Sequence, residues 1–161
     1  MTQQTQRVAI VTGAARGIGA GTAIRLAADG LAVAVLDLDE GMCADTVKEI
    51  EGAGGKALAV GADVSQTEQV EAALARVAAE LGAPTVLVSN AGIQIVRPIV
   101  DFPFADWKRL LAIHLDGAFL TTKACLKHMY AAKSGSVIYM GSVHSKEASV
   151  LKAPYVTAKH G

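Results

Sequence analysis

The sequence is poor in the residues that mark disulfide-rich, metal-binding and nucleic-acid-binding proteins. Its 161 residues include two cysteines, Cys43 and Cys125, which lie far apart without a CxxC pattern or a histidine at ligand spacing. We expect both to be buried free thiols and expect no metal site. Lysine and arginine total 15, as do aspartate and glutamate, so no surplus of positive charge is available for phosphate contacts. A role in binding nucleic acid is therefore not expected.

Long apolar runs are also absent, although apolar residues make up 52% of the chain. Glycine, aspartate and lysine interrupt the apolar segments, so none reaches the roughly 20 unbroken residues that a membrane span requires. Residues 1–7 are polar and show neither the apolar stretch nor the cleavage site of a signal peptide. We therefore expect a soluble, cytoplasmic protein without a membrane partner.

Short apolar segments typical of buried parallel strands alternate along the chain with segments of helical periodicity. The predicted strands are 8–11, 31–36, 56–60, 85–89 and 136–140. The predicted helices are 18–28, 40–50, 66–81 and one that begins near Pro154, and 104–130 is predicted to be a long, mostly helical stretch. This alternation indicates a parallel sheet with helices on both faces, and right-handed crossovers favour a doubly wound, Rossmann-like α/β fold with strand order 3-2-1-4-5. Residues 1–161 are expected to form one domain.

A glycine-rich segment, TGAARGIG at positions 12–19, lies between the first predicted strand and the first predicted helix. A doubly wound fold binds pyrophosphate at this place, because glycines let the backbone approach the phosphate and the helix N-terminus offers free N–H groups. The spacing is GxxxGxG, not the usual GxGxxG. A simple tight turn is the alternative, and the position within the fold argues against it. The predicted phosphate-binding residues are Gly13, Arg16, Gly17, Ile18 and Gly19.

An acidic residue, Asp37, ends the second predicted strand, 18 positions after Gly19. In this fold such a carboxylate accepts hydrogen bonds from the adenosine ribose, and its charge repels a 2′-phosphate. The sequence therefore favours NAD over NADP, although Asp39 and Glu40 could share this role and Arg16 could partly offset it. A surface aspartate that caps the next helix is the alternative.

A second acidic residue, Asp63, follows the third predicted strand together with Val64. Both could reach the adenine edge in the same architecture. Capping of the following helix is an almost equally good interpretation of Asp63.

A tyrosine and a lysine, Tyr155 and Lys159, lie four positions apart and share one face of the last predicted helix. A free phenol has a pKa of ~10, but a nearby ammonium and a cationic nicotinamide favour phenolate, so the pair could exchange protons with a substrate. Ser142 follows the fifth predicted strand, where its hydroxyl could bind a substrate oxygen as charge develops on it. Each of these signals is weak by itself.

Taken together and in order, four motifs resemble those of the short-chain dehydrogenase/reductase family along the whole chain. They are TGAARGIG at 12–19, Asn90-Ala91-Gly92, Ser142, and Tyr155 with Lys159. The resemblance implies an oxidoreductase that uses a nicotinamide cofactor. It also implies that Asn90, Ala91 and Gly92 stabilise the sheet centre beside the cofactor and that Ser142 orients the substrate. Tyr155 would be the acid/base, and Lys159 would bind the nicotinamide ribose and favour phenolate.

The sequence departs from the family pattern at His114, in the long helix before the fifth strand. Family members usually carry an asparagine there, which helps to hold a water that links the lysine to solvent. The imidazole could replace the amide, relay protons itself, or simply pack in the helix, and the sequence leaves these alternatives open.

Closer similarity, in segments 90–94, 141–145 and 151–161, is to the D-3-hydroxybutyrate dehydrogenases of that family. In that group the residues that match Gln94, His144 and Lys152 hold the substrate carboxylate, and all three side chains can donate to an anion. With Ser142 and Tyr155 they form the predicted substrate site. The resemblance thus implies reversible oxidation of (R)-3-hydroxybutyrate to acetoacetate.

Other functions stay open. A family reductase could act on a 3-oxoacyl thioester, a sugar or a polyol, and a catalytically silent NAD-binding protein is an alternative of another class. The chain ends about two turns into the last predicted helix, so we expect a domain that is incomplete at its C-terminal end, with an open apolar edge and little or no turnover alone. For the complete protein the resemblance implies a homo-oligomer, commonly a tetramer.

Overall fold

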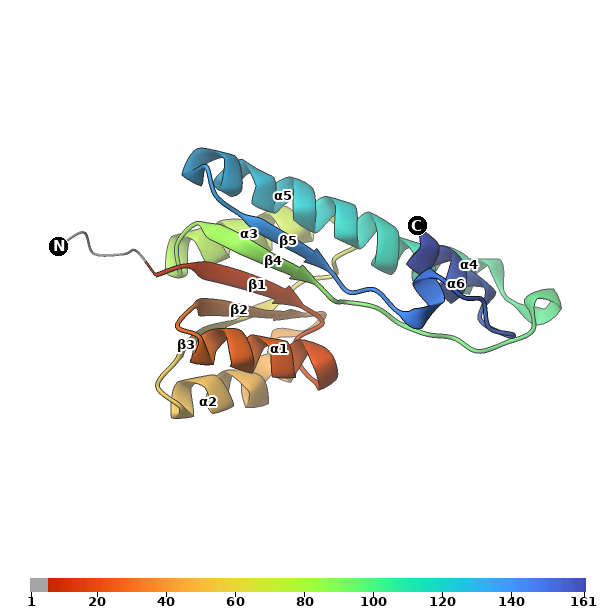
Figure 1. The fold of residues 1–161 in the computed structure, drawn as a ribbon, viewed down its shortest axis with the longest axis horizontal. Helices are drawn as coiled ribbons and strands as arrows, with labels where there is room; N and C mark the ends of the chain where they lie inside the picture. Colours follow the sequence, from red (N-terminus) through yellow and green to blue (C-terminus); the bar gives the residue numbers. More distant parts are fainter. Residues whose placement is uncertain (1–5) are drawn as a thin grey trace.

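The structure is a computed structural model that describes residues 6–161, and it has a parallel sheet of five strands at its centre (Figure 1). The strands are β1 Val8–Thr12, β2 Ala32–Asp37, β3 Lys56–Gly61, β4 Pro84–Ser89 and β5 Ser136–Tyr139. They pair in the order β3-β2-β1-β4-β5, and all four pairings are parallel. The predicted doubly wound α/β fold and its strand order are confirmed.

Helices cover both faces of this sheet. They are α1 Gly17–Ala28, α2 Ala44–Gly52, α3 Thr67–Glu80, α4 Phe104–Leu111, α5 Gly117–Ala132 and α6 Ala153–His160. In Figure 1, α1 and α2 lie on one face, while α3 and α5 lie on the other. Two apolar cores result: Val33 and Val35 pack against α1 and α2, and Ile10 and Leu87 pack against α3 and α5. The alternating direction of side chains along each strand supplies both cores.

The stretch 104–130, predicted to be mostly helical, is helical and is divided into two α-helices. A π-helical turn, Ala112–Asp116, separates α4 from α5. Such a turn keeps the chain helical, so the spacing of apolar residues does not reveal it. Immediately after it, Gly117 opens α5 against the loop that follows β3, where a Cβ would lie 2.7 Å from Cγ2 of Val64.

Both cysteines are buried free thiols, as predicted. Burial raises the pKa of the Cys125 thiol to about 12 and also raises the pKa of Cys43. Both therefore stay protonated and act as apolar core residues. Within the described residues, no cluster of three or more histidine, cysteine or acidic side chains could hold a metal ion.

The region that carries the predicted catalytic residues projects beyond the carboxyl ends of the strands. There α4 and α6 pack together, and α6 also packs on a short 3-10 turn, Val143–Ser145 (Figure 1). β5 is an edge strand of the sheet, with Ile138 and Tyr139 about half exposed, at 48% and 57%. Across residues 6–161, every helix is too short or too polar to traverse a bilayer.

Candidate active site

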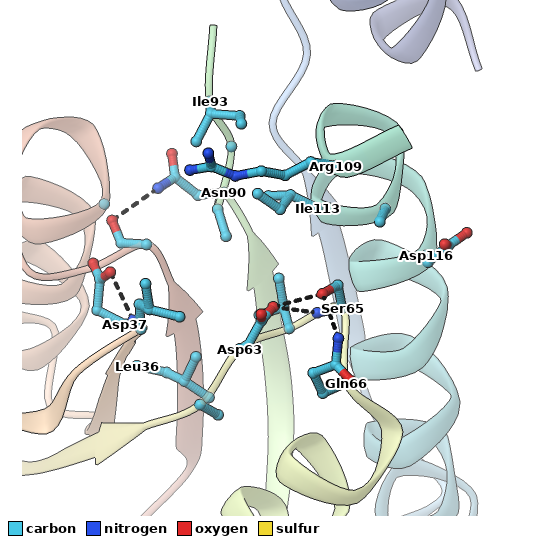
Figure 2. A pocket seen from close by; sticks show the side chains of 18 of the residues that line it. Leu36, Asp37, Asp63, Ser65, Gln66, Asn90, Ile93, Arg109, Ile113 and Asp116 are labelled. Carbon is cyan, nitrogen blue, oxygen red and sulfur yellow. Dashed lines mark hydrogen bonds between the residues drawn. The ribbon is translucent and has the colours of Figure 1, made fainter. Parts of the chain in front are cut away.

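The main cleft of the described chain lies at the carboxyl ends of the strands and has a volume of about 1220 Å³ (Figure 2). It opens where β1 is flanked by β2 and β4, the point at which the order of the strands reverses. Ten of the predicted cofactor-binding residues line it, namely Gly13, Arg16, Ile18, Gly19, Asp37, Asp63, Val64, Asn90, Ala91 and Gly92. Gly17, Tyr155 and Lys159 are not part of its lining.

The glycine-rich loop is shaped by close contacts that only glycine permits. Gly13 has a φ of +65°, and a Cβ on it would lie 2.8 Å from Cα of Ala91. A Cβ on Gly19 would lie 2.1 Å from the carbonyl oxygen of Gly13. The first turn of α1 contains no acidic residue, and its N-cap residue, Arg16, makes no capping hydrogen bond through its side chain. The N-terminal N–H groups and the positive end of the dipole thus face an open cradle suited to an anion.

Asn90 ties the end of β4 to the end of β1. Its side-chain nitrogen donates to the carbonyl oxygens of Thr12 (3.0 Å) and Gly13 (3.1 Å). In return, the hydroxyl oxygen of Thr12 accepts from the backbone N–H groups of Asn90 and Ala91, both at 3.0 Å. This reciprocal set fixes the glycine-rich loop relative to the segment that follows β4.

The carboxylate of Asp37 is held at the end of β2 by two backbone donors. Its oxygens accept from the N–H of Ala15 (3.0 Å) and of Leu38 (2.8 Å). Capping of the next turn falls to Asp39, which accepts from the N–H of Gly41, so the capping alternative for Asp37 is wrong. Carboxylate oxygens have further lone pairs, so Asp37 can still accept from a ribose hydroxyl.

Glu40 and Arg16 are less available for the roles that the sequence left open to them. Glu40 forms a two-point ion pair with Arg76, at 2.7 and 3.2 Å, and this contact lowers the pKa of Glu40. Arg16 lines the cleft but is exposed. The carboxylate of Asp37 is therefore the best-placed acceptor at this end of the cleft.

Asp63 serves as a local cap and lines the cleft as well. One of its oxygens accepts from the N–H (2.9 Å) and the hydroxyl (2.7 Å) of Ser65 (Figure 2). Val64 is buried against Gly117 and also borders the cleft. Both interpretations of Asp63 are thus compatible with the geometry.

The predicted acid/base pair lies on α6, next to the cleft. Nζ of Lys159 is 5.8 Å from the ring centroid of Tyr155 and donates to the carbonyl oxygen of Met140 at the end of β5. Burial lowers the pKa of Lys159. Two imidazoles bracket the phenol ring edge to face: His114 at a centroid distance of 5.5 Å and His144 at 5.7 Å.

Ser142 begins the turn that carries His144. Its hydroxyl oxygen accepts from the N–H of His144 (3.2 Å), and its own N–H donates to the hydroxyl of Ser145 (3.1 Å). This reciprocal cap fixes the turn against which α6 packs. The side chain of Ser142 is half-buried.

Of the three residues of the predicted carboxylate clamp, the structure brings two together. Nζ of Lys152 lies 3.4 Å from Nε2 of His144, a side chain that is only 9% exposed. The other ring nitrogen of His144 faces the carbonyl oxygen of Glu147 at 3.3 Å, which favours a proton on Nδ1 and leaves Nε2 to accept from Lys152. Gln94 is exposed and makes no hydrogen bond within residues 6–161.

Arg109 is a residue of the cleft that the sequence did not reveal. It extends from the end of α4 across the cleft toward Asn90 (Figure 2), and it forms no ion pair in the described part of the chain. Arg109 lies four positions before Ile113, which also lines the cleft, so the two residues share one face of a helix. The sequence does not show that this face turns toward the cleft, so the spacing alone could not predict Arg109 as a cleft residue.

Comparisons with known proteins show which family the chain resembles. The model of the short chain dehydrogenase family matches residues 7–161. A cis-4-hydroxycyclohexanecarboxylate dehydrogenase from Sinomonas cyclohexanicum is 41% identical over 97% of this chain and 63% of its own. A 3-oxoacyl-[acyl-carrier-protein] reductase from Synechocystis is 39% identical over 100% of this chain and 66% of its own. A D-beta-hydroxybutyrate dehydrogenase from Cupriavidus necator is 38% identical over 96% of this chain and 60% of its own.

A solved structure of the same family has the same fold. A metagenomic short-chain oxidoreductase in complex with NADP superposes with a TM-score of 0.90 at 34% identity, over 95% of this chain and 70% of that one. The chain spans 60 to 66% of the length of the three relatives named above.

Proposed function

The chain belongs to the short-chain dehydrogenase family, and we propose that the whole protein transfers a hydride between NAD and a small hydroxy or keto acid. The open N-terminus of α1 suits a diphosphate, because its first turn carries no acidic residue and its N-cap side chain makes no capping hydrogen bond, while Gly13 and Gly19 let the loop pack closely against Asn90 and Ala91. A bound nicotinamide would supply the hydride acceptor. The residues that would hold the dinucleotide are those of the glycine-rich loop, Asp37, Asp63, Val64 and Asn90-Ala91-Gly92.

The preference for NAD rests on Asp37. Its carboxylate, fixed by the N–H groups of Ala15 and Leu38, would repel the extra phosphate of NADP. Since a structure of similar fold contains NADP, the fold does not decide between the cofactors and the local charge must do so.

The proposed chemistry is proton transfer by Tyr155 coupled to hydride transfer from the substrate carbon. When the alcohol is oxidised, its hydroxyl proton passes to the phenolate of Tyr155 and its carbon-bound hydrogen leaves with two electrons as hydride. Lys159 lies beside Tyr155 on α6, with Nζ 5.8 Å from the centroid of the phenol ring, and would bind the nicotinamide ribose. Ser142 would donate a hydrogen bond to the substrate oxygen.

The proposed substrate is (R)-3-hydroxybutyrate, with acetoacetate as product, and one observation carries this choice. Lys152 and His144 meet at 3.4 Å beside Tyr155, so an ammonium held by an imidazole stands next to the acid/base residue. Lys152 would supply the positive charge and the hydrogen bond that a carboxylate needs, and His144, whose Nε2 accepts from Lys152, would hold that ammonium in place. Gln94, on the exposed segment after β4, would be a further donor. Two of the relatives carry the names of hydroxy-acid dehydrogenases.

A substitution of Lys152 in the whole protein tests this choice. Lys152→Ala should raise the KM for 3-hydroxybutyrate at least tenfold and leave the KM for NAD within about twofold, because a charged hydrogen bond is worth about 1.5–3 kcal/mol. Lys146→Ala, which removes an exposed lysine nearby in sequence, is the matched control. An equal rise of both KM values would remove Lys152 from the substrate site.

A reductase of 3-oxoacyl thioesters is the second candidate, favoured by the 39% identity to such an enzyme. It needs no carboxylate donor. Faster turnover of an acetoacetyl thioester with NADPH than of 3-hydroxybutyrate with NAD would establish it and exclude the first choice.

The assembly and compartment of the whole protein are part of the same proposal. We place it in the cytoplasm as a homotetramer, as the family resemblance implies. The large apolar side chains exposed on α4 and α5, among them Phe104 (70%) and Phe119 (64%), support an interface between copies. Light scattering of the whole protein would test the tetramer.

A further inference from the structure

A single ring nitrogen of His114 faces both backbone groups of Ile93. Its Nε2 lies 3.1 Å from the Ile93 nitrogen and 2.8 Å from the Ile93 oxygen. The two residues are 21 positions apart, so this contact joins the π-helical turn to the segment that follows β4. Ile93 lines the cofactor cleft and His114 contacts Tyr155, so the imidazole also joins the cleft to the acid/base residue.

Two neighbours pack against the ring in this position. On one side it lies against Gly92, where an added Cβ would be 2.4 Å from its Cε1. On another side it meets the Tyr155 ring at an interplanar angle of 85°. Tyr155 is in turn contacted by His144, so the orientation of the phenol depends on both imidazoles.

This geometry bears on whether the ring can relay protons. An imidazole relay takes a proton on one nitrogen and releases one from the other, so both nitrogens must lie on the proton path. Nε2 of His114 faces only the peptide groups of Ile93, which neither accept a proton nor pass it to solvent. A proton therefore cannot pass through the ring by way of Nε2.

The charges around the ring also disfavour a protonated state. Lys159 and Tyr155 face it from α6, Asp116 is on its own turn, and the segment 90–93 carries no ionisable side chain. Burial, together with the positive charge of Lys159, holds the pKa of His114 below its usual value, although the bond to Ile93 acts in the opposite direction. We therefore expect the His114 ring to be neutral when the protein acts.

We propose that His114 is a positioning residue that fixes the Ile93 backbone and the Tyr155 ring together and transfers no proton. This inference rests on the proposed function, since it assigns Tyr155 as the acid/base. An imidazole nitrogen can serve only one of the two Ile93 groups at a time, whereas the amide of an asparagine can accept from the N–H and donate to the carbonyl at once.

Two substitutions in the whole protein separate positioning from relay. His114→Ala should lower kcat about 10- to 100-fold with little change in the KM for substrate, because a displacement of about 1 Å at the reacting group has effects of this size. His114→Asn should recover kcat to within about threefold of the unsubstituted protein and keep the same pH profile. His128→Asn, the same change at a helical histidine outside the cleft, is the matched control.

Two outcomes would overturn the positioning role proposed for His114. One is a His114→Asn variant as slow as His114→Ala with an altered pH profile. The other is recovery of His114→Ala turnover by free imidazoles at rates that depend on the imidazole pKa, because refilling the cavity alone would give no such dependence. No hydride transfer by the unsubstituted protein with any hydroxy acid would instead contradict the proposed function.

A measurement that needs no turnover tests the contact itself. Because the contact of Nε2 with the Ile93 oxygen (2.8 Å) is shorter than that with the Ile93 nitrogen (3.1 Å), the ¹⁵N shifts of the His114 ring should report the neutral tautomer that carries its proton on Nε2 between about pH 7 and 8. Shifts averaged between the two tautomers would show a ring that exchanges protons freely and would overturn the inference, whether or not the protein is active.

Discussion

Substitution of Gly92 by alanine is the most direct perturbation of the contact between His114 and Ile93. The added Cβ would lie 2.4 Å from Cε1, 3.0 Å from Nε2 and 3.1 Å from Nδ1 of His114. An ordinary carbon–carbon contact is about 3.5 Å, so the ring or the backbone must move by about 1 Å. That shift would stretch the contacts with Ile93, now 3.1 and 2.8 Å, to about 4 Å and break them.

The size of the effect follows from two losses. Overpacking in a core costs about 1–3 kcal/mol, and the low end applies here because Gly92 is exposed and borders the cleft. With the lost hydrogen bond, worth about 1 kcal/mol, Gly92→Ala should lower the free energy of unfolding by about 1–2 kcal/mol. Turnover of the whole protein should fall about 10- to 100-fold, since Tyr155 loses its support.

Urea unfolding followed by circular dichroism measures the first effect, and a steady-state assay of hydride transfer measures the second. Gly21→Ala in α1 is the control: no atom lies within 4 Å of its added Cβ, so it should leave stability unchanged or raise it by up to about 1 kcal/mol. The double variant Gly92→Ala, His114→Ala removes the clash and should be less destabilised than the sum of its parts. A Gly92→Ala protein as stable as the unsubstituted one would refute the packing on which the positioning role depends.

Three further predictions concern the cofactor cleft and pH. Asp37→Ala should raise the Kd for NADH about tenfold and weaken discrimination against NADPH, measured by fluorescence titration; an unchanged ratio of the two affinities would exclude Asp37 as the determinant. Arg109→Ala should weaken NADH binding about 3- to 30-fold, and more at low salt, because the exposed guanidinium extends into the cleft where a diphosphate would lie; Lys123→Ala, exposed on α5, is its control. The pKa of His114 is lower in the folded state than in the unfolded chain, so below about pH 6.5 the unfolded chain binds more protons. The stability that this difference contributes is complete above pH 6.5 and is lost as the pH falls through the pKa of the folded state. His114→Asn should therefore flatten the fall in stability between about pH 7 and 5, and an unchanged slope would show that another group causes it.

The fold and the cofactor cleft were largely predictable from the sequence, because local signals specify them. Strand ends, glycines and the helix N-terminus at 12–19 are close in sequence, and topology brings the ends of β2, β3 and β4 to the same edge of the sheet. The predicted phosphate and adenosine residues therefore line one cleft, with Gly17 as the exception in the glycine-rich loop.

Contacts between distant segments were not predictable. The bond between His114 and Ile93 depends on the rotation of a helix that a π turn resets, and no spacing rule reports such a turn. The inward position of Arg109 was unpredictable for the same reason. The donor role of Gln94 came from resemblance alone, and the structure leaves this side chain exposed and apart from the pair formed by His144 and Lys152.

Substitution of Tyr155 by phenylalanine in the whole protein tests the central claim most directly. The change removes only the hydroxyl and keeps the ring between His114 and His144. NADH formation from (R)-3-hydroxybutyrate should fall by about 10²- to 10⁴-fold, while the Kd for NADH stays within about threefold. Tyr139→Phe on the edge strand, whose hydroxyl contacts Thr122, should keep its turnover. A Tyr155→Phe protein that retains full turnover would contradict the assignment of this phenol as the acid/base of a dehydrogenase.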